Sequence, residues 1–201
     1  MRGPDAGGKA EGDGDSGKQS ERNKDGFRRR CVACRKQTGH RFRMAGRYRR
    51  GENKMKSIIV MASVHHENTK KIVEAIAKEC NVEVVDATRV KEMELSGYDC
   101  IGFASGIYYG KFHQTVLNFA SVNLPANKKV FYLCTYGGSA AYKSIEEVTA
   151  SKHAVDIGYF GCKGYDTYGP FKLLGGIAKG HPDEKDIADA VAFYKKLEEK
   201  I

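Results

Sequence analysis

A short turn rich in hydroxyl, amide and imidazole groups follows the first strongly apolar stretch of this chain. It reads Met61-Ala-Ser-Val-His-His-Glu-Asn-Thr69 and is followed by the amphipathic pattern that begins at Lys70. A strand, a polar turn and a helix in this order direct backbone N–H groups and the positive end of a helix dipole at an anion. We therefore expect a phosphate site here, and its candidate residues are Ser63, His65, His66, Asn68 and Thr69.

The turn lacks the two glycine patterns of the common nucleotide-binding loops. It contains neither Gly-x-x-x-x-Gly-Lys, which binds nucleoside triphosphates, nor Gly-x-Gly-x-x-Gly, which binds dinucleotides. The pattern favours a single terminal phosphate held mostly by neutral donors. Two simpler interpretations stay open: Asn68 caps the following helix, because asparagine is a preferred N-cap residue, and the two histidines are surface turn residues.

Two further segments combine glycine with tyrosine at the ends of predicted strands. Glycine allows the backbone to approach a ligand closely, and tyrosine offers a flat face for stacking on a ring. Their candidate residues are Ser105, Gly106, Ile107, Tyr108, Tyr109, Gly110, Thr135, Tyr136, Gly137 and Gly138. The alternatives are an ordinary turn at the two adjacent glycines and a core position for one of the two adjacent tyrosines. Together with the phosphate turn, these segments indicate a pocket for a phosphorylated planar heterocycle.

Alternating strands and helices must position these three turns. Apolar runs rich in β-branched residues predict strands at Ser57–Ala62, Val82–Ala87, Asp99–Ser105, Lys129–Thr135 and Asp156–Cys162. Helical periodicity predicts helices at Thr69–Cys80, Phe112–Ser121, Tyr142–Ser151 and Glu184–Lys200, the last with Asp183 as its N-cap. This alternation predicts an α/β fold with three layers, a doubly wound five-stranded parallel sheet covered on both faces. Ligands of such sheets bind outside the carboxyl ends of the strands, where the three turns lie.

The excess positive charge of the chain lies in its first quarter. Residues 1–54 carry 16 of the 34 lysines and arginines but 7 of the 25 acidic residues, so residues 55–201 are neutral. The first 54 residues have little apolar periodicity, which predicts a disordered basic extension. The stretch Arg49-Arg50-Gly51-Glu52 can be encoded by purine-rich codons resembling a ribosome-binding site. We therefore expect translation to start at Met55, a hypothesis that the intact mass of the native protein tests.

The cysteines and the apolar runs predict a protein of a reducing compartment. Cys80, Cys100, Cys134 and Cys162 are scattered singly in apolar surroundings and are interpreted as packing residues. Cys31, Cys34 and His40 lack the second ligand pair that a zinc site needs, so no metal site is expected. No apolar run reaches the length of a membrane span and no secretory signal core is present, which favours a cytoplasmic location. Nucleic-acid binding is disfavoured, because it would depend on the basic extension alone.

Residues 55–201 resemble the flavodoxins and related bacterial flavodoxin-domain proteins. Ser63, Asn68 and Thr69 match the family's phosphate turn, Ser/Thr-x-Thr-Gly-Asn-Thr, in which Glu67 replaces the usual glycine. A family variant reads His-His-Gly-Asn-Thr, which this chain matches at every position except Glu67. The Ser105–Gly110 and Thr135–Gly138 segments match the two loops that flank the flavin ring. The resemblance implies the strand order 2-1-3-4-5 and flavin mononucleotide (FMN) as the cofactor.

The resemblance implies a redox function with two versions. In the first, the protein carries electrons between cellular partners and no residue acts as an acid, base or nucleophile, because the flavin supplies the chemistry. In the second, it is an FMN-dependent oxidoreductase with its own substrate, of the protoporphyrinogen, quinone or NAD(P)H type. The stretch Cys162–Pro170 fits either version, because Asp166, Thr167 and Tyr168 line either the flavin's outer face or a substrate mouth. The simpler interpretation, slightly favoured, is a structured loop. The oligomeric state is not predicted.

Overall fold

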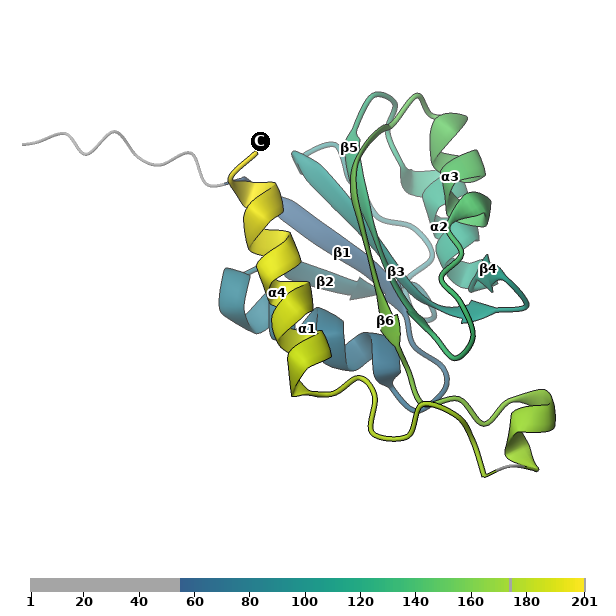
Figure 1. Ribbon diagram of the computed structural model, residues 1–201. Coiled ribbons are helices and arrows are strands. Elements are labelled where there is room, and N and C mark those ends of the chain that lie inside the picture. Colours follow the sequence, from purple (N-terminus) through teal and green to yellow (C-terminus); the bar gives the residue numbers. More distant parts are fainter. Residues whose placement is uncertain (1–54, 174, 201) are drawn as a thin grey trace, which may run out of the picture. The chain divides into compact units, whose positions relative to one another are not determined.

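The computed structural model describes residues 55–173 and 175–200 (Figure 1). These residues form the strands β1 (Ser57–Ala62), β2 (Glu83–Asp86), β3 (Cys100–Tyr108), β4 (Lys111–Phe112), β5 (Lys129–Tyr136) and β6 (Val155–Lys163). They also form the helices α1 (Asn68–Cys80), α2 (Gln114–Asn123), α3 (Lys143–Ala150) and α4 (Glu184–Glu198), and the short 3₁₀ helix η1 (Gly169–Lys172). The basic extension, with Cys31, Cys34 and His40, lies outside the described residues.

The sheet has the predicted topology. The order β2-β1-β3-β5-β6 is parallel throughout, and these strands are the five predicted ones in the predicted order. One addition was not predicted. Strand β3 continues to Tyr108 instead of ending at Ser105, and its last residues pair with the short antiparallel strand β4. The first glycine-tyrosine segment, Ser105–Gly110, is therefore largely part of a strand.

The central strand β1 is buried on both sides. Ile58 and Val60 belong to one apolar core, and Ile59 and Met61 belong to the other, because successive side chains of a strand point to opposite faces. Helices α1 and α4 cover one face of the sheet, whereas α2 and α3 cover the other (Figure 1). This arrangement is the predicted three-layer fold, and it holds the carboxyl ends of β1, β3 and β5 together.

The ends of two helices carry different signals. Asp183 caps α4 as predicted: its side chain accepts the N–H of Asp186, which in turn accepts the N–H of Asp183. The alternative interpretation that Asn68 caps α1 is wrong, because the helix begins at Asn68 and Glu67 holds the cap position without a side-chain cap bond. The side chain of Asn68 is thereby available for another role.

Among the described helices, none has the length and apolarity needed to span a bilayer.

The cysteines of the sheet are packing residues. Cys100 and Cys134 are fully buried, and Cys162 is nearly so. Burial raises the pKa of the Cys100 and Cys162 thiols to about 12, since a thiolate is poorly solvated in an apolar core. Both thiols therefore stay protonated at neutral pH, which agrees with the structural interpretation of these residues.

Candidate functional site

A pocket of about 190 Å³ lies outside the carboxyl ends of β1, β3 and β5. The turns after these strands meet there because parallel strands end at the same edge of a sheet. Ten of the residues predicted for the cofactor pocket line it: His65, Asn68, Thr69, Gly106, Ile107, Tyr108, Tyr109, Thr135, Tyr136 and Gly137. The three segments identified in the sequence thus converge on one cavity.

The other five predicted residues do not line this pocket. Ser63 accepts the backbone N–H of Lys70 at 3.3 Å, and so it stabilises the first turn of α1. The hydroxyl of Ser105 is fully buried, accepts the N–H of His113 at 2.8 Å and donates to the carbonyl of Gly106. Gly110 and Gly138 are exposed, and His66 lines a neighbouring hollow instead.

A fourth segment completes the pocket. Gly164, Tyr165, Asp166, Tyr168 and Phe171 line it, and all of them follow β6. We call residues 164–173 and 175–182 the post-β6 segment; in Figure 1 it connects β6 to α4 and contains η1. The favoured interpretation of a merely structural loop is therefore incomplete, since Asp166 and Tyr168 lie in the cavity wall. Gly164, Tyr165 and Phe171 were not predicted.

Hydrogen bonds attach the post-β6 segment to the turn after β1. The amide nitrogen of Asn68 donates to the carbonyl of Tyr165 at 2.8 Å, and His66 Nε2 lies 2.9 Å from the Thr167 hydroxyl. The His66 and Tyr165 rings lie 4.5 Å apart between centroids. Gly164 permits this contact, because a Cβ at that position would lie 2.8 Å from the Asn68 amide nitrogen. The segment is therefore part of the site.

Aromatic rings form the mouth of the pocket. Tyr109 and Tyr168 are exposed and pack edge to face with 5.3 Å between ring centroids, and their hydroxyls form a hydrogen bond. Tyr108 lies deeper, with its ring 5.7 Å from that of His65. Both predicted tyrosines therefore line the pocket, so the alternative that placed one of them in the core is wrong. Such walls suit a flat, conjugated ligand.

The charges in the pocket are few and partly buried. Burial raises the pKa of Tyr108, hydrogen bonds from the backbone of Val64 and His65 oppose that shift, and the Asp166 carboxylate adds to it. Burial and the charge of His65 lower the pKa of His113 behind the wall. The Tyr108 hydroxyl therefore stays protonated and lies against the backbone of the turn after β1. Asp166 is the carboxylate among the lining residues.

One buried polar atom at the site lacks a partner. Asn68 is 8% exposed, and its side-chain oxygen forms no hydrogen bond to any described residue. Its amide nitrogen is already bonded to Tyr165, so the oxygen needs a donor from elsewhere. A buried acceptor without a partner costs free energy, and such atoms are rare in folded proteins. This atom indicates that the site receives a ligand or an ordered water with a hydroxyl or N–H group.

Comparison with known proteins agrees with the geometry. Residues 58–161 match the family model described as a flavodoxin domain. An uncharacterised protein of Methanocaldococcus jannaschii is 42% identical over 147 residues, which span 71% of this chain and 98% of that protein. The chain belongs to the flavodoxin-domain family. The predicted family is thereby confirmed.

Solved flavodoxins share the fold of this flavodoxin domain. The flavodoxin of Streptococcus pneumoniae superposes with a TM-score of 0.52 at 18% identity, covering 72% of this chain and 99% of that one. A WrbA-like flavodoxin of Agrobacterium tumefaciens gives a TM-score of 0.53 at 13% identity, covering 72% of this chain and 96% of that one. At these identities the likeness concerns the fold, so the site must be argued from its own residues.

The turn after β1 of this flavodoxin domain contains two non-glycine residues with a left-handed φ, His66 and Glu67. Glu67 has a φ of 52°, in the left-handed region that glycine adopts without strain. Its carboxylate is 66% exposed and lies 2.8 Å from Lys70 Nζ. The glutamate at the glycine position of the family pattern therefore affects the backbone energy of the turn, while its charge is directed to Lys70.

We expect Glu67→Gly to stabilise the domain by about 1 kcal/mol, because a left-handed conformation costs a non-glycine residue about 1–2 kcal/mol, part of which the greater chain entropy of glycine offsets. Urea unfolding measures the change. Glu67→Ala is the matched control, since it removes the carboxylate and keeps the strain. Equal stabilisation by both variants would show that charge, and not backbone conformation, disfavours Glu67.

Proposed function

We propose that this flavodoxin domain binds FMN and carries electrons between redox partners. The observation that carries the proposal is the aromatic pocket at the ends of β1, β3 and β5, with the partnerless oxygen of Asn68 in its wall. FMN combines a flat conjugated ring, a chain with hydroxyl donors and a phosphate. These three parts correspond to the tyrosine walls, the Asn68 oxygen and the turn before α1. We assign the function to the residues from 55 onward.

The residues present fit this cofactor. Tyr108, Tyr136 and Tyr168 offer ring faces and edges to the isoalloxazine, and Gly106 and Gly137 bring backbone close to it. A Cβ at Gly137 would lie 2.5 Å from a carboxylate oxygen of Asp166, so a larger residue there would displace a pocket wall. The flavin supplies one- or two-electron transfer when bound, whereas the protein binds it, orients it and limits its contact with water.

A second function is an FMN-dependent oxidoreductase with its own substrate. The observation that favours it is the mouth of the pocket, where Tyr109 is 83% and Tyr168 is 53% exposed beside Asp166. A flat substrate of the quinone, porphyrinogen or nicotinamide type would stack on these rings. A protein electron carrier does not need such a mouth, so turnover with small acceptors distinguishes the two functions.

Titration of the full chain with FMN tests the proposal. We expect saturable binding with a shifted flavin absorption band and quenched fluorescence. Gly137→Val should weaken binding at least about tenfold, because its side chain meets Asp166 in the pocket wall. Gly138→Ala is the matched control, because a Cβ at Gly138 meets nothing within 4 Å. Absence of binding by the unaltered chain at micromolar FMN would refute the proposal.

A further inference from the structure

A row of tyrosine side chains leads away from the aromatic pocket along one face of the sheet. Tyr132 and Tyr136 lie on β5 with their side chains on the same face, because residues an even number of positions apart in a strand share a face. Tyr159 of β6 lies opposite Tyr132 in the strand register. Tyr142 directly precedes α3 and packs, like Tyr136, against the apolar core of this face.

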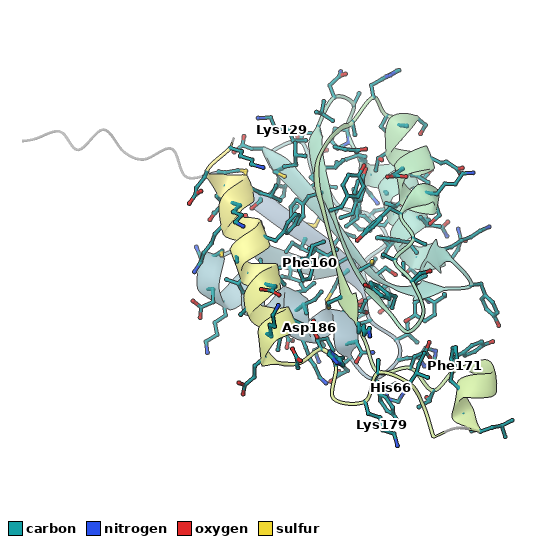
Figure 2. All side chains as sticks on the ribbon, in the orientation of Figure 1. His66, Lys129, Phe160, Phe171, Lys179 and Asp186 are labelled. Atoms are coloured by element: carbon teal, nitrogen blue, oxygen red, sulfur yellow. The ribbon has the colours of Figure 1, made fainter. Side chains whose placement is uncertain are left out.

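Tyr136 is the member of the row that belongs to the pocket wall. In Figure 2, Lys129, the first residue of β5, lies at the opposite end of the molecule from Phe171 of the pocket wall, so β5 runs toward the pocket. A Cβ at Gly161 would lie 2.7 Å from the Tyr142 hydroxyl oxygen and 3.2 Å from a ring carbon of Tyr136. Gly161 therefore leaves room for these two tyrosines to lie beside each other.

The remaining contacts continue the row to the surface of β6. The Tyr142 and Tyr159 rings pack edge to face with 5.1 Å between their centroids, and the Tyr132 and Tyr159 rings are also 5.1 Å apart. Tyr132 is fully buried, whereas Tyr159 is 43% exposed. Aromatic rings thus connect the wall of the pocket with the outside of the molecule.

A carboxylate lies at the outer end of the row. The hydroxyl of Tyr159 donates to Asp156 Oδ2 at 2.9 Å, and that of Tyr132 donates to Asp156 Oδ1 at 2.5 Å. Burial and these hydrogen bonds raise the pKa of both phenols, so both are protonated at neutral pH. The Tyr142 hydroxyl instead has a hydrogen bond with the thiol of Cys134, which is a much weaker proton acceptor.

This difference in partners gives the row a direction for electron transfer. Aromatic rings in contact exchange electrons through their π-systems, and a phenol that loses an electron becomes a strong acid. It then gives its proton to a hydrogen-bonded base, which keeps the resulting radical in place. Such a base is present at Tyr159, which is also accessible to a soluble reductant. An oxidising equivalent that enters the row at Tyr136 should therefore settle at Tyr159.

We propose that Tyr136, Tyr142 and Tyr159 form a relay that delivers an electron from the protein surface to a light-excited flavin in the pocket. The inference rests on the proposed function. The excited, oxidised flavin takes one electron from Tyr136, and the electron vacancy moves through Tyr142 to Tyr159. Tyr159 gives its proton to Asp156. The products are a neutral tyrosyl radical, a protonated carboxyl group and a flavin reduced by one electron.

A soluble enediol reductant such as ascorbate completes the reaction. It gives one electron to the Tyr159 radical, and Asp156 returns the proton to the phenolate oxygen. The ascorbate releases its own proton to water and leaves as the ascorbyl radical. In sum, light moves one electron from ascorbate to the flavin, and both Tyr159 and Asp156 return to their initial states.

Laser-flash absorption of the full chain loaded with FMN tests the relay. We expect a neutral tyrosyl radical to appear together with the reduced flavin. Tyr142→Phe and Tyr159→Phe should each shorten the lifetime of this radical at least about tenfold, because phenylalanine keeps the ring but is not oxidised by the flavin. Tyr98→Phe is the matched control, since Tyr98 also donates to a carboxylate, that of Glu83 at 2.5 Å, but lies outside the row.

Two further measurements separate the relay from a structural role and from the proposed function. Asp156→Asn should also shorten the radical lifetime, because an amide does not take up the proton. A cluster that only packs α3 on the sheet would change the free energy of unfolding and leave the lifetime unchanged in every variant. That result, or the absence of a tyrosyl radical in a chain that binds FMN, would refute the relay while the flavin function stands. If titration shows that the unaltered chain binds no FMN, the proposed function fails and the relay fails with it.

Discussion

Gly102→Ala is expected to lower the free energy of unfolding by about 3 kcal/mol. Gly102 lies in the middle of β3, with Ile59 of β1 and Phe131 of β5 as its sheet neighbours. A Cβ at this position would lie 2.4, 2.6 and 2.9 Å from three ring atoms of Phe131. Real Cβ atoms do not approach other atoms so closely. Overpacking of a dense core costs about 1–3 kcal/mol, and this contact belongs to the severe end of that range.

The Phe131 ring cannot move aside easily. It is fully buried, and its centroid lies 5.7 Å from that of Tyr194 and 6.4 Å from that of Phe193 on α4. A shift of the ring would therefore displace the helix that covers this face of the sheet. The candidate site lies at the end of the same strands, so the variant should also weaken ligand binding there.

Urea unfolding measures the effect of Gly102→Ala, and two further variants isolate its cause. Gly97→Ala should be nearly neutral, because a Cβ at Gly97 meets nothing within 4 Å. The double variant Gly102→Ala, Phe131→Leu should be more stable than the sum of its single effects, because leucine removes the ring atoms involved in the clash. Strictly additive effects would show that Gly102 is needed for another reason than contact with Phe131.

The sequence predicted the elements whose signal is local. Strand β1 has the predicted bounds, and Asp183 caps α4 as predicted, because an unbroken apolar run and a capping pattern are each encoded within a few neighbouring residues. The end of β3 was not predicted. Gly106 suggested a loop, but Ile107 and Tyr108 pair with Phe112 and Lys111, and this pairing keeps the chain extended. Periodicity carries little information on so short a hairpin.

The candidate site was predicted from the rule that ligands bind at the carboxyl ends of parallel strands. That rule found the three turns after β1, β3 and β5, and most of their singled-out residues line the pocket. It did not give the path of the post-β6 segment. The bonds of Asn68 to Tyr165 and of His66 to Thr167 join residues about a hundred positions apart, and no local pattern encodes them. For the same reason, the neighbouring hollow that His66, Lys71 and Lys179 line was not predicted.

Removal of the Asp166 carboxylate is the second change from which we expect a large effect, here on the redox potential of a bound flavin. Asp166 lines the pocket, and hydrogen bonds hold both its side chain and its backbone in place. Its side chain accepts the N–H of Tyr168 at 2.8 Å, and its backbone forms two hydrogen bonds with Ile177. Its charge, added to burial, raises the pKa of Tyr108 across the pocket. A charge that shifts the pKa of a residue in the cavity wall also changes the electrostatic potential at a flavin ring bound in the cavity.

We expect Asp166→Asn to raise the midpoint potential of bound FMN by about 50 mV. Reduction adds electrons to the flavin, and a nearby negative charge opposes this step through a partly desolvated medium. For a one-electron step, about 59 mV corresponds to a tenfold change in the equilibrium constant. Asparagine keeps the oxygen that accepts the Tyr168 N–H, so the post-β6 segment should keep its conformation. A dye-coupled redox titration of the full chain with FMN measures the potential.

Asp189→Asn is the control for a general effect of charge, because Asp189 is an exposed residue of α4 that faces Lys185 at 2.5 Å. It should leave the potential unchanged. An Asp166→Asn variant that binds FMN normally and keeps the original potential would show that the carboxylate does not act on the ring. A drop in FMN affinity without a shift in potential would instead assign Asp166 a role in holding the post-β6 segment. A shift without loss of affinity supports direct electrostatic tuning of the flavin by this residue.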